Sequence, residues 1–309
     1  MSVDEMRTAE STRGNDPHAP SWHPERFKGV IFDVGMHDGA DTESYLSRGY
    51  AVLAIEADPS LASAGVDRFD DAIGRGQLRI LNLGIGEQED ASTFWICDDN
   101  SAWNSFDVRI ASRNGCRHHP IRIAARPFHQ VLDEFGVPEY LKIDIEGADW
   151  LCVRDLDRLH LPRFISVESE CAGDGEILNE HESLRMLDLL RDAGYSRFKL
   201  VSQDDFTTAV HPDYWRMARK VIDSSSYGRL EKLHLGPLLR RFSTKGRLER
   251  LNDGMPLTCG STGPWGNGLL GRWRTYDQAR QIYLRLRDRF FADSEVKTYA
   301  FWYDWHGTY

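Results

Sequence analysis

Residues 30–58 constrain the fold of this chain more than any other stretch, because they read as strand, glycine turn, helix and second strand. The first strand is apolar and β-branched, as a strand buried in a parallel sheet requires. A turn containing Gly35 and Gly39 follows, and then a predicted helix over residues 41–48. The second strand ends in Glu56. This order predicts the opening of a nucleotide-binding α/β domain.

The spacing of the two glycines distinguishes between two kinds of cofactor. A dinucleotide site needs G-x-G-x-x-G, so that a pyrophosphate can lie against backbone amides at a helix N-terminus. Here His37 and Asp38 lie in the turn, and an acid there repels phosphate. Asp33 and Asp38 favour the cationic amino acid portion of S-adenosylmethionine, and Glu56 is placed to bind the ribose hydroxyls. A purely structural turn is the alternative.

Strand and helix signals alternate along the rest of the chain. Strands are predicted over residues 77–83, 93–96, 121–124, 140–143, 164–167 and 198–201, and helices over 127–135, 147–156 and 181–193. This alternation predicts a mostly parallel sheet with helices on both faces. The carboxyl ends of the strands then meet at one edge, so Ala57, Asn82 and Gly84 are expected near the glycine turn as further cofactor contacts.

Acidic side chains follow two of these strands. Asp144 and Glu146 come after one strand, and Glu168 and Glu170 after the next. Four carboxylates at a sheet edge are hard to explain by core packing, because unpaired buried acids are costly. They are therefore candidates for chemistry, with helix N-terminal charge as the alternative for Glu146.

Composition narrows the class of protein. A net charge of −10 gives no reason to expect nucleic-acid binding. The five cysteines are scattered and lack C-x-x-C spacing, which favours free thiols in a reducing compartment. No secretory leader and no apolar run long enough for a membrane span is present, so the expected location is the cytoplasm. Residues 1–26 are expected to form a flexible leader.

Together these motifs resemble the FkbM-type S-adenosylmethionine-dependent methyltransferases over roughly residues 30–201. The resemblance rests on Asp33-Val34-Gly35 through Gly39, on Glu56, and above all on Leu141-Lys142-Ile143-Asp144-Ile145-Glu146-Gly147-Ala148-Asp149. It implies O-methylation of a hydroxyl on a small molecule, such as a sugar or a polyketide. His37 stands where many family members carry Asn. The resemblance adds Asp144 to the expected cofactor contacts.

The family also implies a class I methyltransferase fold. This fold is a doubly wound, mostly parallel seven-stranded sheet, whose antiparallel last strand is inserted beside the fifth. Residues 299–306 are the natural candidate for that strand, pairing with 197–202. The expected organisation is a cofactor-binding core over 27–202, an insertion that recognises substrate over 203–296, and a closing strand over 297–309.

Methyl transfer to a hydroxyl requires a group that takes the proton. The candidates are Asp144, Glu146 and His306, the last only if the final strand returns to the carboxyl edge of the sheet. A metal ion is the other way to acidify a hydroxyl. Asp144, Glu168 and Glu170 offer the hard oxygen ligands of Mg²⁺, a pattern that resembles the magnesium site of catechol-type and macrolide-sugar O-methyltransferases.

The insertion carries two further features. Residues 215–250 contain ten Lys or Arg and only three acids, so this segment is basic. It either guides an anionic substrate toward the site or forms an amphipathic helix that packs on the domain or on a partner subunit. The glycine-rich stretch 260–268 is either a lid or a plain loop. A homo-oligomer is left open. Two other classes stay open as well: an NAD-dependent oxidoreductase and a noncatalytic binding protein with this fold.

Overall fold

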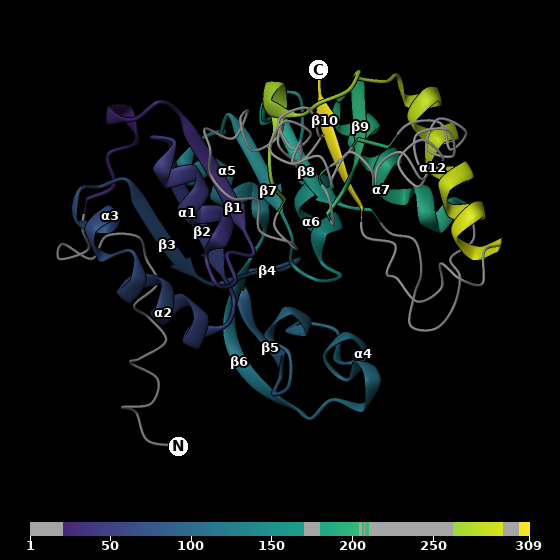
Figure 1. Ribbon diagram of the computed structural model, residues 1–309. Helices are drawn as coiled ribbons and strands as arrows, with labels where there is room; N and C mark the ends of the chain where they lie inside the picture. Colours follow the sequence, from purple (N-terminus) through teal and green to yellow (C-terminus); the bar gives the residue numbers. More distant parts are fainter. Residues whose placement is uncertain (1–20, 170–179, 204–205, 207, 210–261, 293–302) are drawn as a thin grey trace, which may run out of the picture.

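A seven-stranded sheet forms the centre of the structure, with the strand order β3-β2-β1-β7-β8-β10-β9 (Figure 1). The computed structural model describes residues 21–169, 180–203, 206, 208–209, 262–292 and 303–309. The strands are β1 (Val30–Val34), β2 (Ala51–Glu56), β3 (Leu78–Asn82), β7 (Tyr140–Ile143), β8 (Phe164–Glu168), β9 (Arg197–Ser202) and β10 (Tyr303–Thr308). Only β10 runs antiparallel to its neighbours, β8 and β9. The central strands are apolar and buried, as a sheet covered on both faces requires.

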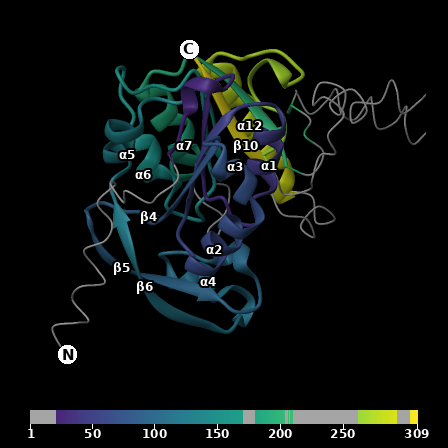
Figure 2. The same ribbon diagram turned by 90° about the vertical axis from the view of Figure 1, so that its left-hand side faces the viewer.

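Helices cover both faces of this sheet. One face packs against α1 (Ala40–Ser47), α2 (Pro59–Arg68) and α3 (Asp70–Gly74). The other face packs against α5 (Phe128–Phe135), α6 (Asp149–Arg154), α7 (Glu180–Ala193) and α12 (Tyr276–Ala292). Figure 2 shows α5 and α6 on one side of the sheet and α1 on the other. Each face therefore has its own apolar core. No helix in the described part of the chain is long and apolar enough to cross a membrane.

A small three-stranded sheet projects from the main body (Figure 1), and its strands lie between β3 and α5 in the sequence. Its strands are β4 (Gly84–Ile85), β5 (Asp90–Cys97) and β6 (His118–Arg126), in the order β4-β6-β5. The connection between β5 and β6 holds η2 (Ser101–Trp103), α4 (Val108–Ala111) and η3 (Arg113–Gly115). The strands predicted over 93–96 and 121–124 exist, but they build this separate sheet, which the sequence did not predict.

The topology confirms the predicted class I methyltransferase fold. The last strand lies between β8 and β9 and is antiparallel to both, as expected. It begins at Tyr303, and residues 299–302 of its predicted range lie outside the described residues. The basic segment 215–250, most of the leader and Glu170 also lie outside them. Within residues 21–26, a single short helix, η1 (Pro24–Arg26), forms.

Residues 262–268 belong to the glycine-rich stretch for which the sequence left open a lid or a loop. Trp265 is only 8% exposed and stacks on Tyr140, with ring centroids 4.5 Å apart and planes 11° apart. Its ring also packs against Tyr50 and Phe164. This part of the stretch therefore completes the core beside α1, while a lid role for the whole stretch stays a prediction.

Replacing Trp265 by Ala should lower the free energy of unfolding by about 3–5 kcal/mol, because it removes a large aromatic ring from a packed core. Urea unfolding measures the change. Leu159→Ala is the control, since Leu159 is 82% exposed, and this variant should change stability by less than about 0.5 kcal/mol. A Trp265→Ala protein with unchanged unfolding would show that the ring does not hold the core together.

Candidate functional site

A cavity of about 310 Å³ lies at the carboxyl edge of the main sheet, where the small sheet meets it. Several residues predicted to bind cofactor line it: Gly35, His37, Asp38, Glu56, Ala57 and Gly84. The acids Asp144, Glu146 and Glu168 line the same cavity. Asp33, Gly39 and Asn82, which the sequence also predicted to bind cofactor, do not line it. The structure thus brings the glycine turn and the acid cluster to one cavity.

The glycine turn between β1 and α1 depends on close approach of two backbones. Gly35 has φ +85°, and a Cβ atom there would lie 1.8 Å from the carbonyl oxygen of Asp144. Gly39 has φ +81° and precedes the first residue of α1. Only glycine accepts both the positive φ and this contact at Gly35 without strain. The turn therefore packs directly on the strand end that carries the acid cluster.

Lys142 joins the turn to that strand end, although the sequence had given it no role. Its Nζ donates to the carbonyl oxygen of Gly35 at 2.6 Å and pairs with Asp33 Oδ1 at 3.1 Å and with Asp144 Oδ2 at 3.8 Å. Asp33 also accepts a 2.6 Å hydrogen bond from the Thr42 hydroxyl. Burial alone would lower the pKa of Lys142, but the surrounding carboxylates raise it above its ordinary value. Lys142 is therefore a buried cation that stays charged.

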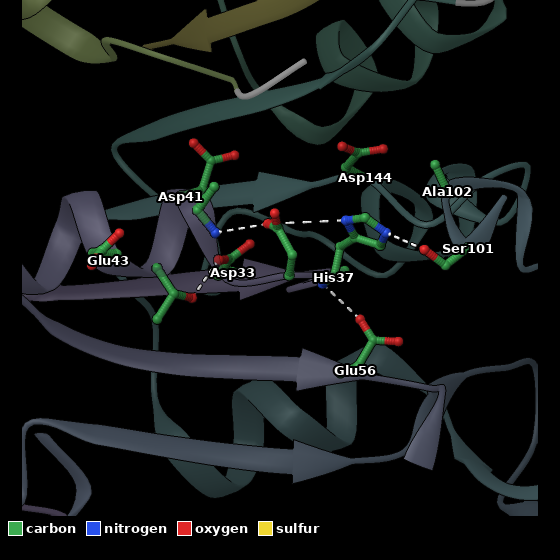
Figure 3. A network of polar contacts seen from close by, with 12 residues as sticks. Asp33, His37, Asp41, Glu43, Glu56, Ser101, Ala102 and Asp144 are labelled. Atoms are coloured by element: carbon green, nitrogen blue, oxygen red, sulfur yellow. Dashed lines mark hydrogen bonds and ion pairs between the residues drawn. The ribbon is translucent and has the colours of Figure 1, made fainter. Parts of the chain in front are cut away.

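Glu56 lies at the end of β2, where the sequence placed the ribose-binding carboxylate. Figure 3 shows its contact with the glycine turn, a 2.7 Å hydrogen bond from the backbone N–H of His37 to Oε2. The backbone N–H of Asp58 donates to Oε1 at 2.8 Å. Burial raises the pKa of Glu56, and these two hydrogen bonds oppose the rise. Asn82 contacts the end of β2, where its Nδ2 donates to the backbone oxygen of Glu56 at 2.9 Å.

Asp144, Glu146 and Glu168 form a cluster in which one carboxylate oxygen from each residue lies within 4.8 Å of the other two. The cluster contains two of the predicted metal ligands, Asp144 and Glu168, with Glu146 as the third member in place of Glu170, which is not among the described residues. Three oxygen ligands at this spacing could hold a metal ion.

Glu146 has an unusual backbone and an unusual carboxyl group. Its φ is +48°, in the left-handed region that glutamate seldom adopts. The Asp149 carboxylate holds the turn around it, accepting hydrogen bonds from Ile145 at 3.0 Å and from Gly147 at 3.2 Å. Burial, and then the charges of Asp144 and Asp149, raise the pKa of Glu146 to about 8, against the opposing effect of Arg113. Strained, perturbed residues of this kind cluster at functional sites.

The structure does not bring His306 to the cavity. Strand β10 enters the sheet at the carboxyl edge, with Asp304 opposite Glu168, so His306 lies deeper, opposite Ser166 and Lys199. It is 1% exposed. Burial, with a smaller effect of the Lys199 charge, lowers its pKa to about 3. A neutral, enclosed imidazole at this depth belongs to the core of the sheet.

Sequence reasoning missed the part of the site that comes from the small sheet. Ser101, Ala102, Asn104 and Phe106 line the cavity from the connection between β5 and β6. The one available signal was a polar Ser/Asn/Asp stretch between two predicted strands. That signal marks a loop but does not say which strand ends the loop covers.

The family model described as the methyltransferase FkbM domain matches residues 33–197, which is more than half of the chain. No curated protein matches the sequence.

Among solved structures, the precorrin-6Y C5,15-methyltransferase of Geobacter metallireducens is 13% identical, over 56% of this chain and 68% of that chain, with a TM-score of 0.32. The methyltransferase domain of bacterial CtHen1-CN is 10% identical, over 58% and 82%, with a TM-score of 0.33. A SAM-dependent methyltransferase of Aquifex aeolicus is 10% identical, over 65% and 93%, with a TM-score of 0.29.

The buried His306 should make the protein less stable at acid pH. The unfolded chain protonates this imidazole below about pH 6.5, whereas the folded protein, with a pKa of about 3, does not. The free energy of unfolding should therefore fall by about 1.4 kcal/mol per pH unit below 6.5 through this group. Urea unfolding of wild type and His306→Gln at pH 7.5 and 5.0 measures the effect. The fall should be smaller in the variant, and equal falls would contradict the assignment.

Proposed function

The chain belongs to the FkbM methyltransferase family, and from this premise we propose that it transfers the methyl group of S-adenosylmethionine to a hydroxyl of a small-molecule acceptor. One observation carries the proposal: a single cavity joins the glycine turn and Glu56 to the acid cluster of Asp144, Glu146 and Glu168. A cofactor and an acceptor could thus meet at one strand edge. The acceptor classes, a sugar, a polyketide or another hydroxyl compound, rest on the resemblance alone.

The cavity walls fit the parts of S-adenosylmethionine. Glu56 would accept hydrogen bonds from the ribose hydroxyls, because its oxygens each hold one backbone N–H and retain further lone pairs. Ile85, Phe94 and Phe106 give an apolar wall for the base. The carboxylates of Asp38, Asp41 and Asp144 suit the positively charged amino acid end. The cofactor supplies a methyl group already activated on a sulfonium, so the protein must position the acceptor and remove its proton.

We assign Glu146 as the general base that accepts the proton of the acceptor hydroxyl. Glu146 lines the cavity together with Asp144. Its backbone has a positive φ, a strained conformation for glutamate, in the turn after β7. The pair with Arg113, at 3.3 Å, fixes one side of the carboxylate. In this assignment a Glu146 carboxylate oxygen would accept the proton of the acceptor hydroxyl. The hydroxyl oxygen would bond to the methyl carbon as the carbon–sulfur bond breaks, with S-adenosylhomocysteine as the leaving group.

Mg²⁺ is an alternative use of the same acids. Asp144, Glu146 and Glu168 would hold the ion, which would acidify the acceptor hydroxyl as a Lewis acid. The spacing of the three carboxylates favours this reading. In it, Glu146 is a ligand and not the base, so the two assignments differ in their response to chelation.

Replacing Glu56 by Ala should weaken binding of S-adenosylhomocysteine by tenfold or more, because the ribose loses charge-assisted hydrogen bonds. Isothermal titration with and without Mg²⁺ measures the change. Glu43→Ala is the control, since Glu43 is exposed, pairs with Arg68 and does not line the cavity. An unchanged isotherm for Glu56→Ala would refute the ribose assignment. Binding of NADH in place of S-adenosylhomocysteine would establish an oxidoreductase, and binding of neither would indicate a noncatalytic protein.

Replacing Glu146 by Gln should lower kcat about a hundredfold or more with any acceptor that the wild type methylates, because the proton acceptor is lost. Transfer of labelled methyl to a panel of hydroxyl compounds gives the rate. Affinity for S-adenosylhomocysteine should change by less than about twofold, since the proposal assigns Glu146 to the acceptor hydroxyl and not to the cofactor. Wild-type activity that survives EDTA supports the base, and activity that EDTA abolishes and Mg²⁺ restores supports the metal. A Gln variant with wild-type kcat would contradict both.

A further inference from the structure

The connection between β5 and β6 crosses the carboxyl edge of the main sheet and is tied to three of its turns. Ser101 contacts the turn after β1, through His37. Asn104 contacts the turn after β2, where its Nδ2 donates to Asp58 Oδ2 at 2.9 Å. Ser105 contacts the turn after β7, with its hydroxyl donating to the carbonyl oxygen of Glu146 at 2.8 Å. The small sheet is thus anchored at the turns that line the cavity.

The first contact reaches one oxygen of Glu56. The Ser101 hydroxyl and His37 Nε2 share a hydrogen bond of 2.8 Å (Figure 3). The backbone N–H of the same histidine donates to Glu56 Oε2 at 2.7 Å. His37 has φ +51°, so its backbone is unusual for a residue other than glycine. Ser101 therefore acts on the Glu56 carboxylate through the strained residue of the glycine turn.

The second contact reaches the other oxygen. The Asp58 side chain that accepts from Asn104 also caps α2, accepting from the Ser60 N–H at 2.8 Å, and the Asp58 backbone N–H donates to Glu56 Oε1 at 2.8 Å. The Asn104 side-chain oxygen accepts from the Cys97 N–H at 2.8 Å, at the end of β5. Asn104 and Asp58 are both buried. Removing one partner would leave the other buried without its hydrogen bond.

These contacts form a closed ring around one carboxylate. Ser101 and Asn104 lie on the same short segment, and the paths from them end on opposite oxygens of Glu56. A carboxylate held from both sides keeps one orientation, and ligands that use it lose less freedom on binding. Both residues also line the cavity, so the ring closes where a nucleoside would lie.

We propose that residues 101–104 are a cofactor-positioning segment, in which Ser101 and Asn104 orient Glu56 for the ribose of an S-adenosyl compound. The small sheet would then set the affinity for the cofactor through a residue that it does not itself carry. This inference rests on the proposed function, because it takes Glu56 as the ribose ligand. Ser101 and Asn104 are positioning residues in it, and the acceptor chemistry is left to the acid cluster.

A double-mutant cycle tests the proposal on the full-length chain. Affinity for S-adenosylhomocysteine is measured by titration calorimetry for wild type, Ser101→Ala, Glu56→Ala and the double variant, and the same cycle is run with Asn104→Ala. Each single change in the segment should weaken binding about fivefold, the equivalent of one hydrogen bond. In the Glu56→Ala background the same changes should have an effect of less than about twofold, because the group that they orient is gone.

Ser112→Ala is the matched control, since Ser112 lies in the same connection and its hydroxyl donates within that segment, to the carbonyl oxygen of Arg109 at 3.4 Å. It should leave the affinity unchanged. Thermal unfolding of each variant shows whether it is folded, and a loss of affinity that Ser112→Ala shares would mean a general effect on the small sheet.

The outcomes separate the inference from the proposed function. If wild type does not bind S-adenosylhomocysteine, or if Glu56→Ala binds as wild type does, the proposed function fails first. If Glu56→Ala weakens binding but the Ser101→Ala and Asn104→Ala changes have no effect, or add fully to it, the positioning role is overturned. Coupling in both cycles supports it.

Discussion

The site depends on one buried cation, Lys142. Its ammonium lies between the strand end of β1 and that of β7, bonded to the Gly35 carbonyl oxygen and paired with Asp33 and Asp144. Asp33 is fully buried, and its Oδ1 has no hydrogen-bond partner in the described structure apart from this ion pair. Removal of one member of a buried ion pair leaves an uncompensated charge that costs several kcal/mol. A change that breaks this ion pair should therefore disturb both the glycine turn and the acid cluster.

The carboxyl edge of the main sheet carries more acidic than basic groups, and Lys142 is already paired with two of the acids. Burial, with the neighbouring Asp144 carboxylate as a smaller cause, raises the pKa values of Asp41 and Asp149 to about 6. Lys142 is committed to the turn, and Arg113 pairs with Glu146 at the rim. An acid-rich cavity of this kind stabilises positive charge, and a sulfonium cofactor carries it. The same excess of acid repels the phosphates of a dinucleotide, in agreement with the glycine spacing.

The sequence predicted the features that depend on local patterns. Apolar runs, turn glycines and acids at strand ends predicted the order of the core elements and the position of Glu56, and the resemblance to the FkbM family implied the class I fold. It could not predict contacts between segments far apart in the chain. Lys142 reads as one polar residue inside an apolar strand, and only the register with β1 shows that it faces Asp33. His306 reads as a base near a chain end, and only the register with β8 shows its depth.

The small sheet is the clearest case of this limit. Its two strands are visible in the sequence, but strands joined by a twenty-residue polar connection can pair in the main sheet or apart from it. The difference lies in what the connection contacts, and here it contacts the turns that contain His37, Asp58 and Glu146. The main sheet fixes the positions of those turns, and the turns hold the connection in place. In our proposal, the connection in turn orients the Glu56 carboxylate. Binding elements that are inserted into a conserved scaffold can thus change affinity without adding a ligand contact, because they act on the side chains that already make one.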